Sequence, residues 1–251
     1  MRYILIGDVH GCLSELKQLL AKVSVTVTDR IVFTGDLIMK GPQQAETVRY
    51  VRDLAKFNDV TLIRGNHEKK FLNYLHAVKT DPIKAGNMKK APLLRKLSND
   101  LSLDDIKFLW SSSWFHKFSS GNRDFIAIHG GITPKMEDSQ FSEKALSKKD
   151  SRRLHQVCHV KYVDPEGGMR AFGSHLEGES FWAEIYDGRF GCAIYGHQAY
   201  WNLTEHPHAI GVDLGCVYGN KLCALIIENG KHTHITIDAE KAYSSEGTGP
   251  I

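Results

Sequence analysis

The stretch RYILIGDVHG at residues 2–11 joins a short, mostly apolar run to a polar turn. Arg2–Ile6 is predicted to be a buried strand, because the run is bounded by a glycine and is too short for a helix. Asp8 and His10 follow this strand two residues apart, so both side chains can point the same way. A carboxylate and an imidazole placed together can hold one metal ion through oxygen and nitrogen.

The same order of strand, polar motif and helix recurs along the first third of the chain. GDLIMKGP at 35–42 and RGNHE at 64–68 each follow an apolar run. This rhythm predicts a largely parallel sheet with crossover helices, in which ligands bind at the carboxyl ends of strands. The predicted strands here are Arg2–Ile6, Arg30–Thr34 and Val60–Arg64, and the predicted helices are Leu13–Val23 and Gln43–Ala55.

Two further motifs, HGG at 129–131 and GH at 196–197, also come at predicted strand ends. The first ends a hairpin that turns at Gly121-Asn122, and Asn229-Gly230 is a second hairpin turn. Residues 76–113 read as irregular helices, with Ser102 able to cap a helix over Leu103–Trp110. The remaining predicted strands are Trp114–Ser120, Asp124–His129, Cys192–Tyr195, Ala209–Asp213, Leu222–Glu228 and His232–Ile237, and residues 134–190 form a long insertion with a basic helix and glycine-rich loops.

The composition is that of an ordinary globular protein. The chain has 251 residues, 42% apolar and 24% charged, with a formal net charge of +3 that is too weak to argue for nucleic acid. We expect one domain over residues 1–240 and a disordered tail over 241–251. The five cysteines form no CxxC pair, the first motif begins at Gly7, and no apolar run reaches the roughly 18 residues of a membrane helix. These features predict a cytoplasmic protein with reduced thiols and no membrane partner.

The motifs together supply the donors that two adjacent metal ions require. One ion can be held by the first motif, Asp36 can bridge, and the later motifs can complete the second ion. Oxygen and nitrogen donors of this mixture suit Mn²⁺, with Fe, Zn or Co as alternatives, better than calcium. Two ions about 3.5–4 Å apart can orient a phosphate and share a hydroxide nucleophile. The candidate ligands are Asp8, His10, Asp36, Asn66, His129 and His197.

Three neighbouring residues can complete a catalytic set. His67 follows Asn66 directly, and a histidine beside the metals that is not needed as a ligand can protonate the leaving oxygen. Arg64 and Lys40 lie within the same motifs and can bind phosphate oxygens or brace the site.

As a set, these motifs resemble the calcineurin-like metallophosphoesterases, in particular the phosphoprotein-phosphatase superfamily with its GDxHG, GDxVDRG, GNHE, HGG and GH signatures. The resemblance covers most of residues 1–237. It implies an α/β fold of two mixed β-sheets flanked by helices, with a dinuclear site at the sheet edge. It also implies that the six candidate ligands hold the metals and that His67 is the general acid.

One departure from that pattern bears on the substrate. Met39 stands where the protein phosphatases have the aspartate that partners the catalytic histidine, and Lys40 replaces their arginine. This variant, and the segment Ala209–Leu225, are similar to the branch related to bacterial diadenosine tetraphosphatases. That branch cleaves phosphoanhydrides in dinucleoside polyphosphates, nucleotide-capped RNA ends or polyphosphate, and some members hydrolyse phosphoproteins. The alternative for Met39 is neutral drift, with water or Glu68 supporting His67.

The resemblance therefore implies a phosphohydrolase acting on dinucleoside polyphosphates such as diadenosine tetraphosphate. A protein serine/threonine phosphatase with the same site is the first alternative, and a phosphate-binding pseudoenzyme is the second. Its partners would be a phosphorylated small molecule or nucleotide, a phosphoprotein, or a capped RNA end.

Candidate substrate contacts are less specific in the sequence. Arg152 and Arg153 could reach the phosphate, although a basic run is usually a solvated helix face, and Tyr218 is a further candidate. Trp182 and Tyr186 could stack an adenine, but a helix that packs on the core is the better interpretation.

Overall fold

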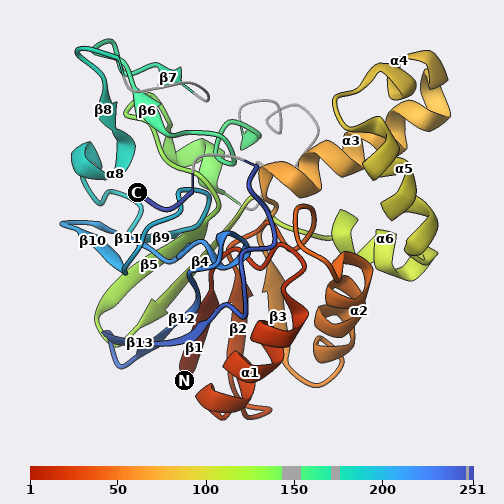
Figure 1. Cartoon of the computed structure of the whole chain (residues 1–251). Helices are drawn as coiled ribbons and strands as arrows, with labels where there is room; N and C mark the ends of the chain where they lie inside the picture. The colour runs from red at the N-terminus through yellow and green to blue at the C-terminus, as the bar shows by residue number, and fades with distance from the viewer. Residues whose placement is uncertain (143–153, 171–175, 247–248) are drawn as a thin grey trace.

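Two mixed sheets of five strands lie face to face in the computed structural model, which describes residues 1–142, 154–170, 176–246 and 249–251 (Figure 1). In the first sheet β1, β2 and β3 are parallel, as predicted, and β12 and β13 join them antiparallel. In the second sheet β11, β9 and β5 are parallel, with β10 and β4 antiparallel at the edges. In the first sheet the spatial order is β13 (Lys231–Asp238), β12 (Lys221–Glu228), β1 (Arg2–Ile6), β2 (Arg30–Phe33) and β3 (Asp59–Leu62). In the second sheet it is β10 (Thr204–His206), β11 (Ala209–Gly211), β9 (Cys192–Tyr195), β5 (Arg123–Ile128) and β4 (Phe115–Ser120).

Alternation along the strands divides the apolar residues between two faces. Tyr3 and Leu5 of β1 belong to the core between the sheets, whereas Ile4 and Ile6 pack against the helices outside. Successive side chains of a strand point to opposite faces, so a run that is apolar throughout predicts a strand covered on both sides. The second sheet supplies Phe125, Ala127, Ile194 and Ile210 to the same central core.

Six helices cover the first sheet and the region beside it (Figure 1). The predicted bounds of the first helix are confirmed, and so is the cap of the last, where the Ser102 hydroxyl accepts from the Asp105 N–H at 3.2 Å. Among the described residues, no helix is both long and apolar enough to cross a membrane. The helices are α1 (Leu13–Val23), α2 (Gln44–Leu54), α3 (Asn66–Thr80), α4 (Pro82–Asn87), α5 (Ala91–Asp100) and α6 (Leu103–Trp110).

The outer face of the second sheet is covered by the segment between β5 and β9. Its described part contains a small sheet where glycine-rich loops were expected, because strands of two residues show no periodicity. Trp182 is fully buried there, which favours the core-packing interpretation over adenine stacking. The expected basic helix falls largely outside the described residues, as do Arg152 and Arg153. The elements are η1 (Asp138–Phe141), β6 (Tyr162–Val163), β7 (Met169–Arg170), β8 (Ser180–Phe181) and α8 (Trp182–Ile185).

Where the sequence suggested a tail without defined structure, the described residues after β13 make specific contacts. The Tyr243 N–H donates to the Val217 carbonyl at 2.9 Å, and its hydroxyl donates to Glu15 at 2.7 Å. The Ile251 N–H donates to the Ala199 carbonyl at 3.1 Å. The tail thus contacts both α1 and the loop that follows β9.

Candidate metal centre

The loops that follow β1, β2, β5 and β9 meet the start of α3 at one edge of the two sheets. The structure brings all six candidate ligands together there. The His129 Nε2 atom lies 2.9 Å from Asn66 Oδ1 and 3.4 Å from Asp36 Oδ2. The His10 Nε2 atom lies 3.7 Å from Asp36 Oδ2 and 4.0 Å from Asp8 Oδ2. The ring of His197 lies 5.0 Å from that of His129, centroid to centroid.

Asp36 is common to two groups of metal-binding atoms. It lies with His10 and His67 in one group and with His129 and His197 in the other, and within each group the donor atoms are less than 4.8 Å apart. One carboxylate shared by two donor groups is the arrangement that a bridging ligand needs. His67, predicted as an acid rather than a ligand, lies at the same centre, with its Nε2 3.9 Å from Asp36 Oδ2.

Backbone carbonyl groups orient two of the imidazole rings. The Nδ1 atoms of His10 and His129 lie 3.0 and 2.9 Å from the carbonyl oxygens of Ile38 and Thr34. A carbonyl oxygen only accepts, so each Nδ1 carries the proton and donates it. The Nε2 atom of each ring then faces the cluster and is the nitrogen through which the ring can bind a metal ion.

Two buried atoms of the six candidate ligands have no hydrogen-bond partner among the described residues, namely Asp8 Oδ1 and His197 Nε2. Buried polar atoms are almost always paired, so such orphans need an explanation. A divalent cation bound between these donors would give both atoms a partner. The mixture of carboxylate, amide and imidazole donors fits Mn, Fe, Zn or Co. The residues present therefore fit a dinuclear metal centre.

The charges of the cluster are strongly coupled. Burial raises the pKa of Asp8, and the neighbouring Asp213 adds to the rise. Burial also acts to raise the pKa of Asp36, but the adjacent His129 and His67 outweigh it and hold that pKa below its usual range. Burial lowers the pKa of His129, yet Asp36 and Asp8 prevail and raise it to about 10. A cationic imidazole thus balances the buried carboxylates, a role that divalent ions can fill.

The backbone at these positions is unusual. His10, Asp36 and His197 have φ angles of 48°, 50° and 68°, in the left-handed region that residues other than glycine seldom adopt. Such conformations cluster at functional sites, where the surrounding structure imposes them. The glycines of the motifs permit close approach: a Cβ atom on Gly65 would lie 2.1 Å from Asp36 Oδ1, and one on Gly196 would lie 2.1 Å from Asp8 Oδ1.

Glu68 fastens two of the motif loops together. Its carboxylate is fully buried and accepts from the N–H groups of Asp36 at 2.8 Å, Gly65 at 3.0 Å and Ile38 at 3.3 Å. Both of its oxygens are used in this way. Glu68 therefore does not support the His67 ring in this structure, which excludes that alternative.

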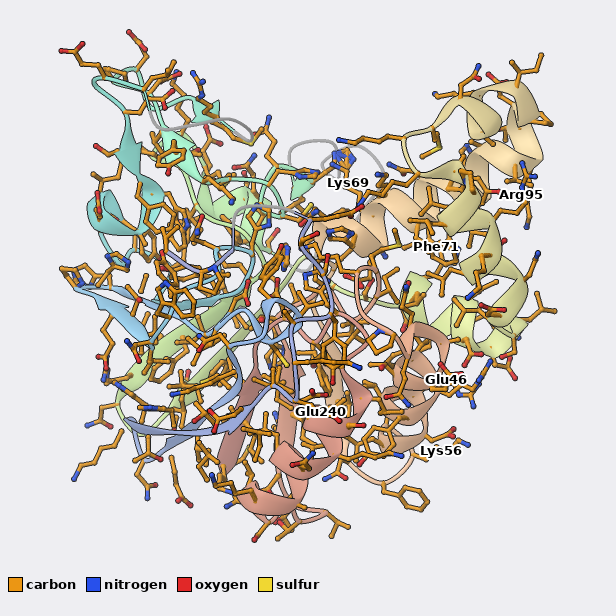
Figure 2. All side chains as sticks on the ribbon, in the orientation of Figure 1. Glu46, Lys56, Lys69, Phe71, Arg95 and Glu240 are labelled. Atoms are coloured by element: carbon orange, nitrogen blue, oxygen red, sulfur yellow. The ribbon has the colours of Figure 1, made fainter. Side chains whose placement is uncertain are left out.

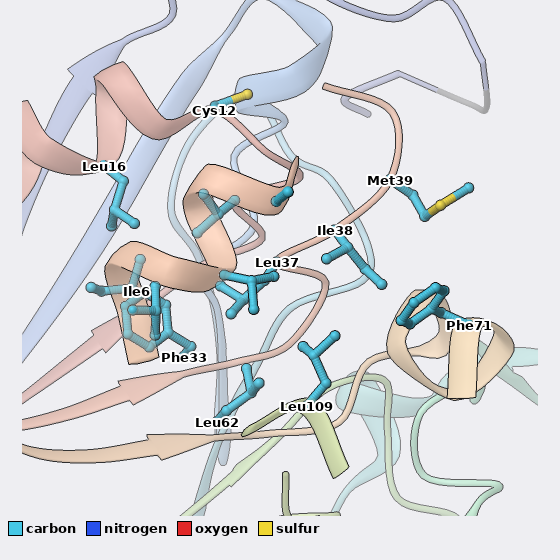
Figure 3. Close-up of a cluster of buried hydrophobic side chains, with 14 of the residues drawn as sticks. Ile6, Cys12, Leu16, Phe33, Leu37, Ile38, Met39, Leu62, Phe71 and Leu109 are labelled. Atoms are coloured by element: carbon cyan, nitrogen blue, oxygen red, sulfur yellow. The ribbon is translucent and has the colours of Figure 1, made fainter. Parts of the chain in front are cut away.

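The His67 ring has no carboxylate partner on its Nδ1 atom, which is buried without a hydrogen bond among the described residues. Burial is the main cause that lowers the pKa of His67 to about 4. Met39, at the position of the aspartate in the protein phosphatases, is 2% exposed and packs in the same apolar cluster as Phe71 (Figure 3).

Arg64 has the geometry of a brace. Its guanidinium donates to the carbonyl oxygens of Trp110 at 2.7 Å and Ser112 at 3.0 Å, and to the Ser112 hydroxyl at 2.9 Å. It also lies 4.9 Å from the centroid of the Trp114 ring. These contacts anchor the end of β3 to the end of α6, which favours the bracing role over the phosphate-binding one.

Lys40 and Tyr218 lie together beside the candidate ligands. The Lys40 Nζ atom donates to the Tyr218 hydroxyl at 2.8 Å and lies 3.1 Å from His10 Nε2. A candidate phosphate contact and a candidate substrate contact, 178 residues apart in sequence, thus share one wall of the site.

Three other charged residues near the centre were not predicted as site residues from the sequence. Lys161 is close enough to depress the pKa of His197, after burial and His129, and Asp213 is a buried carboxylate that acts on Asp8. Lys69, on α3, donates to the His155 carbonyl at 3.4 Å. Lys69 follows the RGNHE motif directly, which was a usable signal, whereas only the fold places Lys161 near His197.

Comparisons with known proteins agree with this geometry. A family model described as calcineurin-like phosphoesterase matches residues 1–200. Bis(5'-nucleosyl)-tetraphosphatase PrpE (asymmetrical) of Bacillus velezensis is 28% identical over 260 residues, which cover 98% of this chain and 96% of that protein. The symmetrical bis(5'-nucleosyl)-tetraphosphatase of Azotobacter vinelandii is 26% identical over 288 residues, covering 94% and 96%.

A solved structure supports the same assignment. A crystal structure provisionally assigned as a diadenosine tetraphosphatase has a TM-score of 0.71 and 26% identity to this chain, covering 95% of it and 93% of that structure. The family model spans well over half of the sequence and includes all six candidate ligands. The chain therefore belongs to the calcineurin-like phosphoesterases, a family of metal-dependent hydrolases.

Proposed function

We propose that this protein hydrolyses phosphoanhydride bonds in dinucleoside polyphosphates such as diadenosine tetraphosphate, with two divalent metal ions, Mn²⁺ foremost. The observation that carries the proposal is the shared position of Asp36 in two donor groups. A site for two adjacent ions is typical of enzymes that cleave phosphate bonds. The relatives named as bis(5'-nucleosyl)-tetraphosphatases, which match nearly the whole chain, support the substrate.

Each residue of the site has a role in this proposal. When bound, the two ions would supply Lewis-acid polarisation of a phosphoryl oxygen. Asp36 would bridge them, and the other five ligands would complete their coordination. His67 would give its proton to the leaving oxygen, and Arg64 would hold the motif loop in place. Lys40 and Tyr218 would hold a phosphate or a nucleoside of the substrate.

The surroundings of His67 support a phosphoanhydride over a phosphoserine ester. A nucleotide that leaves from a polyphosphate is a stable anion, so its departure needs less help from an acid than the departure of a serine alkoxide. In the described residues nothing hydrogen-bonds His67 Nδ1, and Met39 is buried among apolar side chains. Among the described residues, no carboxylate therefore accepts a hydrogen bond from His67 Nδ1 to keep the ring protonated and oriented, as a poor leaving group would require.

The charge around the site also supports a polyanionic substrate. Lys40, Lys69 and Lys161 come from three different segments and act electrostatically on histidines of the centre or beside it. Positive charge gathered around a site raises the local concentration of anions and their rate of association. Nucleotide-capped RNA ends and polyphosphate share this chemistry and are further candidate substrates.

We also propose the cytoplasm as the site of action. All five cysteines are free thiols. Thiols persist in reducing compartments, whereas secreted proteins tend to form disulfides.

A direct substrate comparison tests the function. Metal-stripped protein is reconstituted with Mn²⁺, and kcat/KM is measured for diadenosine tetraphosphate and for a phosphoserine peptide. We expect the dinucleotide to be preferred by at least about tenfold, which corresponds to about 1.4 kcal/mol of transition-state stabilisation. The opposite preference would make the protein a serine/threonine phosphatase. If metal-loaded protein bound both compounds and turned over neither, the phosphate-binding pseudoenzyme would be the correct description.

A further inference from the structure

A separate group of potential metal ligands, outside the candidate dinuclear centre, lies where the loop after β1 joins α1. Cys12, Glu15 and Cys216 offer two sulfur atoms and one carboxylate oxygen that all lie within 4.8 Å of one another. Cys12 immediately precedes α1, Glu15 lies in its first turn, and Cys216 opens η3 (Cys216–Tyr218). Figure 3 shows Cys12 at the N-terminal start of α1, about one helical turn before Leu16. All three ligand residues are at most 1% exposed.

Apolar packing accounts for the two thiols but not for the carboxylate. Cysteine behaves as a small apolar residue when buried, and both cysteines belong to the cluster between the first sheet and its helices. An acidic side chain is almost never fully buried unless it is paired. Glu15 Oε1 accepts from the Tyr243 hydroxyl at 2.7 Å and from the Glu240 N–H at 3.1 Å. Its other oxygen, Oε2, is buried and has no donor among the described residues.

We propose that Cys12, Glu15 and Cys216 bind one soft divalent cation of the zinc class, separate from the dinuclear centre. Thiolate sulfur with a carboxylate oxygen is a donor set that zinc accepts, and it differs from the oxygen and nitrogen donors around Asp36. Zinc–sulfur bonds of about 2.3 Å in a tetrahedral arrangement place two sulfurs about 3.8 Å apart. The observed limit of 4.8 Å means that small side-chain rotations would close the site.

The hydrogen bonds of Glu15 match those of a metal-binding carboxylate. Carboxylate ligands are usually held by hydrogen bonds to the protein, which fix their orientation. Tyr243 and Glu240 provide such bonds on Oε1 and leave Oε2 for the cation. Figure 2 labels Glu240 close to α1, the helix that carries Glu15. Three protein ligands leave the fourth tetrahedral position to a water molecule.

A cation here would connect segments that flank the dinuclear centre. Cys12 follows the candidate ligand His10 by two residues, and Cys216 precedes Tyr218, whose hydroxyl binds Lys40, by two. Binding would tie these two loops to each other and to the tail at Tyr243. The expected consequence is a more stable protein in which His10 and Tyr218 are held in register, because a structural cation adds its binding free energy to folding.

Cobalt spectroscopy on the full chain tests the proposal directly. Stripped protein is reconstituted with Co²⁺, and the near-ultraviolet absorption from thiolate-to-cobalt charge transfer is recorded. The dinuclear centre contains no sulfur donor, so only cysteine ligands can produce this absorption. We expect the band in the wild type, together with one more equivalent of bound zinc than in Cys216→Ser. The absence of this band from wild-type protein whose dinuclear centre is filled with Co²⁺ would overturn the proposal, whatever the variants show.

Matched variants assign the ligands. Cys12→Ser and Cys216→Ser should lose the band, whereas Cys223→Ser, an equally buried thiol on β12, should keep it. Glu15→Gln retains an acceptor oxygen for Tyr243 but loses the charge, so cobalt affinity should fall by about tenfold or more. A band that survives both serine variants would contradict the assignment. So would a wild-type protein whose intact mass lacks two hydrogens until a reductant restores them, because the thiols would then form a disulfide.

Discussion

Asp36 belongs to both donor groups and also accepts the His67 backbone N–H at 3.0 Å, so we expect the centre to be most sensitive to changes at this residue. We expect Asp36→Asn to reduce kcat/KM for diadenosine tetraphosphate by more than about 100-fold. Residues that only hydrogen-bond a metal ligand typically cost about 10–100-fold when mutated, and a bridging ligand should cost more. Bound metal should fall in parallel. Asp59→Asn, an exposed aspartate on β3, is the control and should retain both. A variant with near-normal metal content and rate would show that Asp36 does not bridge.

His67 provides a test that separates acid catalysis from metal binding. If it protonates the leaving oxygen, His67→Asn should keep its metal and lose about 10²–10⁴-fold in rate on esters with poor leaving groups. The loss should be smaller for p-nitrophenyl phosphate, whose leaving group needs little protonation. His76→Asn, an exposed position further along α3, serves as the control. Loss of metal, or equal loss of rate on both substrates, would indicate a ligand or binding role.

At the level of single residues, sequence reasoning works where a motif fixes the chemistry. The donor types of the six candidate ligands, and the neutral Met39, are legible because each lies in a short signature. Their partners are not, since the carbonyls that orient His10 and His129 belong to residues 28 and 95 positions away. The three amide groups held by Glu68 are likewise a product of the fold. Contacts between distant backbone atoms leave no pattern in the sequence.

The loops between elements depend on Glu68, which joins the loop after β2 to the start of α3. Removing a buried acceptor leaves its donors unsatisfied, at about 1–3 kcal/mol each. Glu68→Ala leaves three such donors unsatisfied, so we expect a loss of at least about 3 kcal/mol in the free energy of unfolding. Urea denaturation of metal-free protein measures this. Glu46→Ala on the exposed face of α2 should change stability by less than about 0.5 kcal/mol, and a similar loss in both variants would contradict the role of Glu68.

A second element-scale prediction concerns acid stability. Arg2 at the start of β1 donates to Asp29 at 2.6 and 2.9 Å, and this bonding is the main cause that lowers the pKa of Asp29. The pair therefore stabilises the fold above the unfolded pKa of about 3.9, and this contribution is lost as pH falls through the lower folded value. In metal-free Asp29→Asn the loss of stability below pH 4 should be smaller than in the wild type. The free energy of unfolding is measured by urea denaturation at several pH values. An equal decrease below pH 4 in the wild type and in Asp29→Asn would contradict this prediction.

Helices and strands were predicted correctly where they are long enough to show a periodic pattern of apolar residues. β1, α1 and α6 have the expected bounds because buried apolar residues repeat at the periods of strands and helices. The two-residue strands β6, β7 and β8 were missed, since two residues cannot display alternation. Their pairing depends instead on the segment lying against the second sheet.

For the molecule as a whole, metal binding should be visible as stability. A ligand that binds only the folded state at 100 times its dissociation constant raises the free energy of unfolding by about 2.7 kcal/mol. We expect Mn²⁺ to raise the melting temperature of the stripped protein and a chelator to reverse the effect. Asp36→Asn should reduce this Mn²⁺-dependent shift, and a full shift in that variant would place the stabilising ion elsewhere.

The two-sheet arrangement is the part that local sequence patterns could not provide. β1 pairs with β12 more than 200 residues later, and β9 lies between β5 and β11. Periodicity shows which residues are buried but not which strand neighbours which. The prediction of a sandwich came from resemblance to a family, and the structure confirms it through the core that both sheets share.

The left-handed backbone at His10, Asp36 and His197 has a consequence for anyone who wishes to transplant or redesign this centre. The donors are carried by a set of unusual turns, so copying the six side chains onto regular strands of another scaffold would not reproduce their directions. Replacements at these positions also alter two things at once. Alanine removes the donor and keeps the backbone penalty of about 1–2 kcal/mol, whereas glycine removes the donor and relieves that penalty. Paired glycine and alanine substitutions would therefore separate the chemistry of each ligand from the conformational cost of holding it in place.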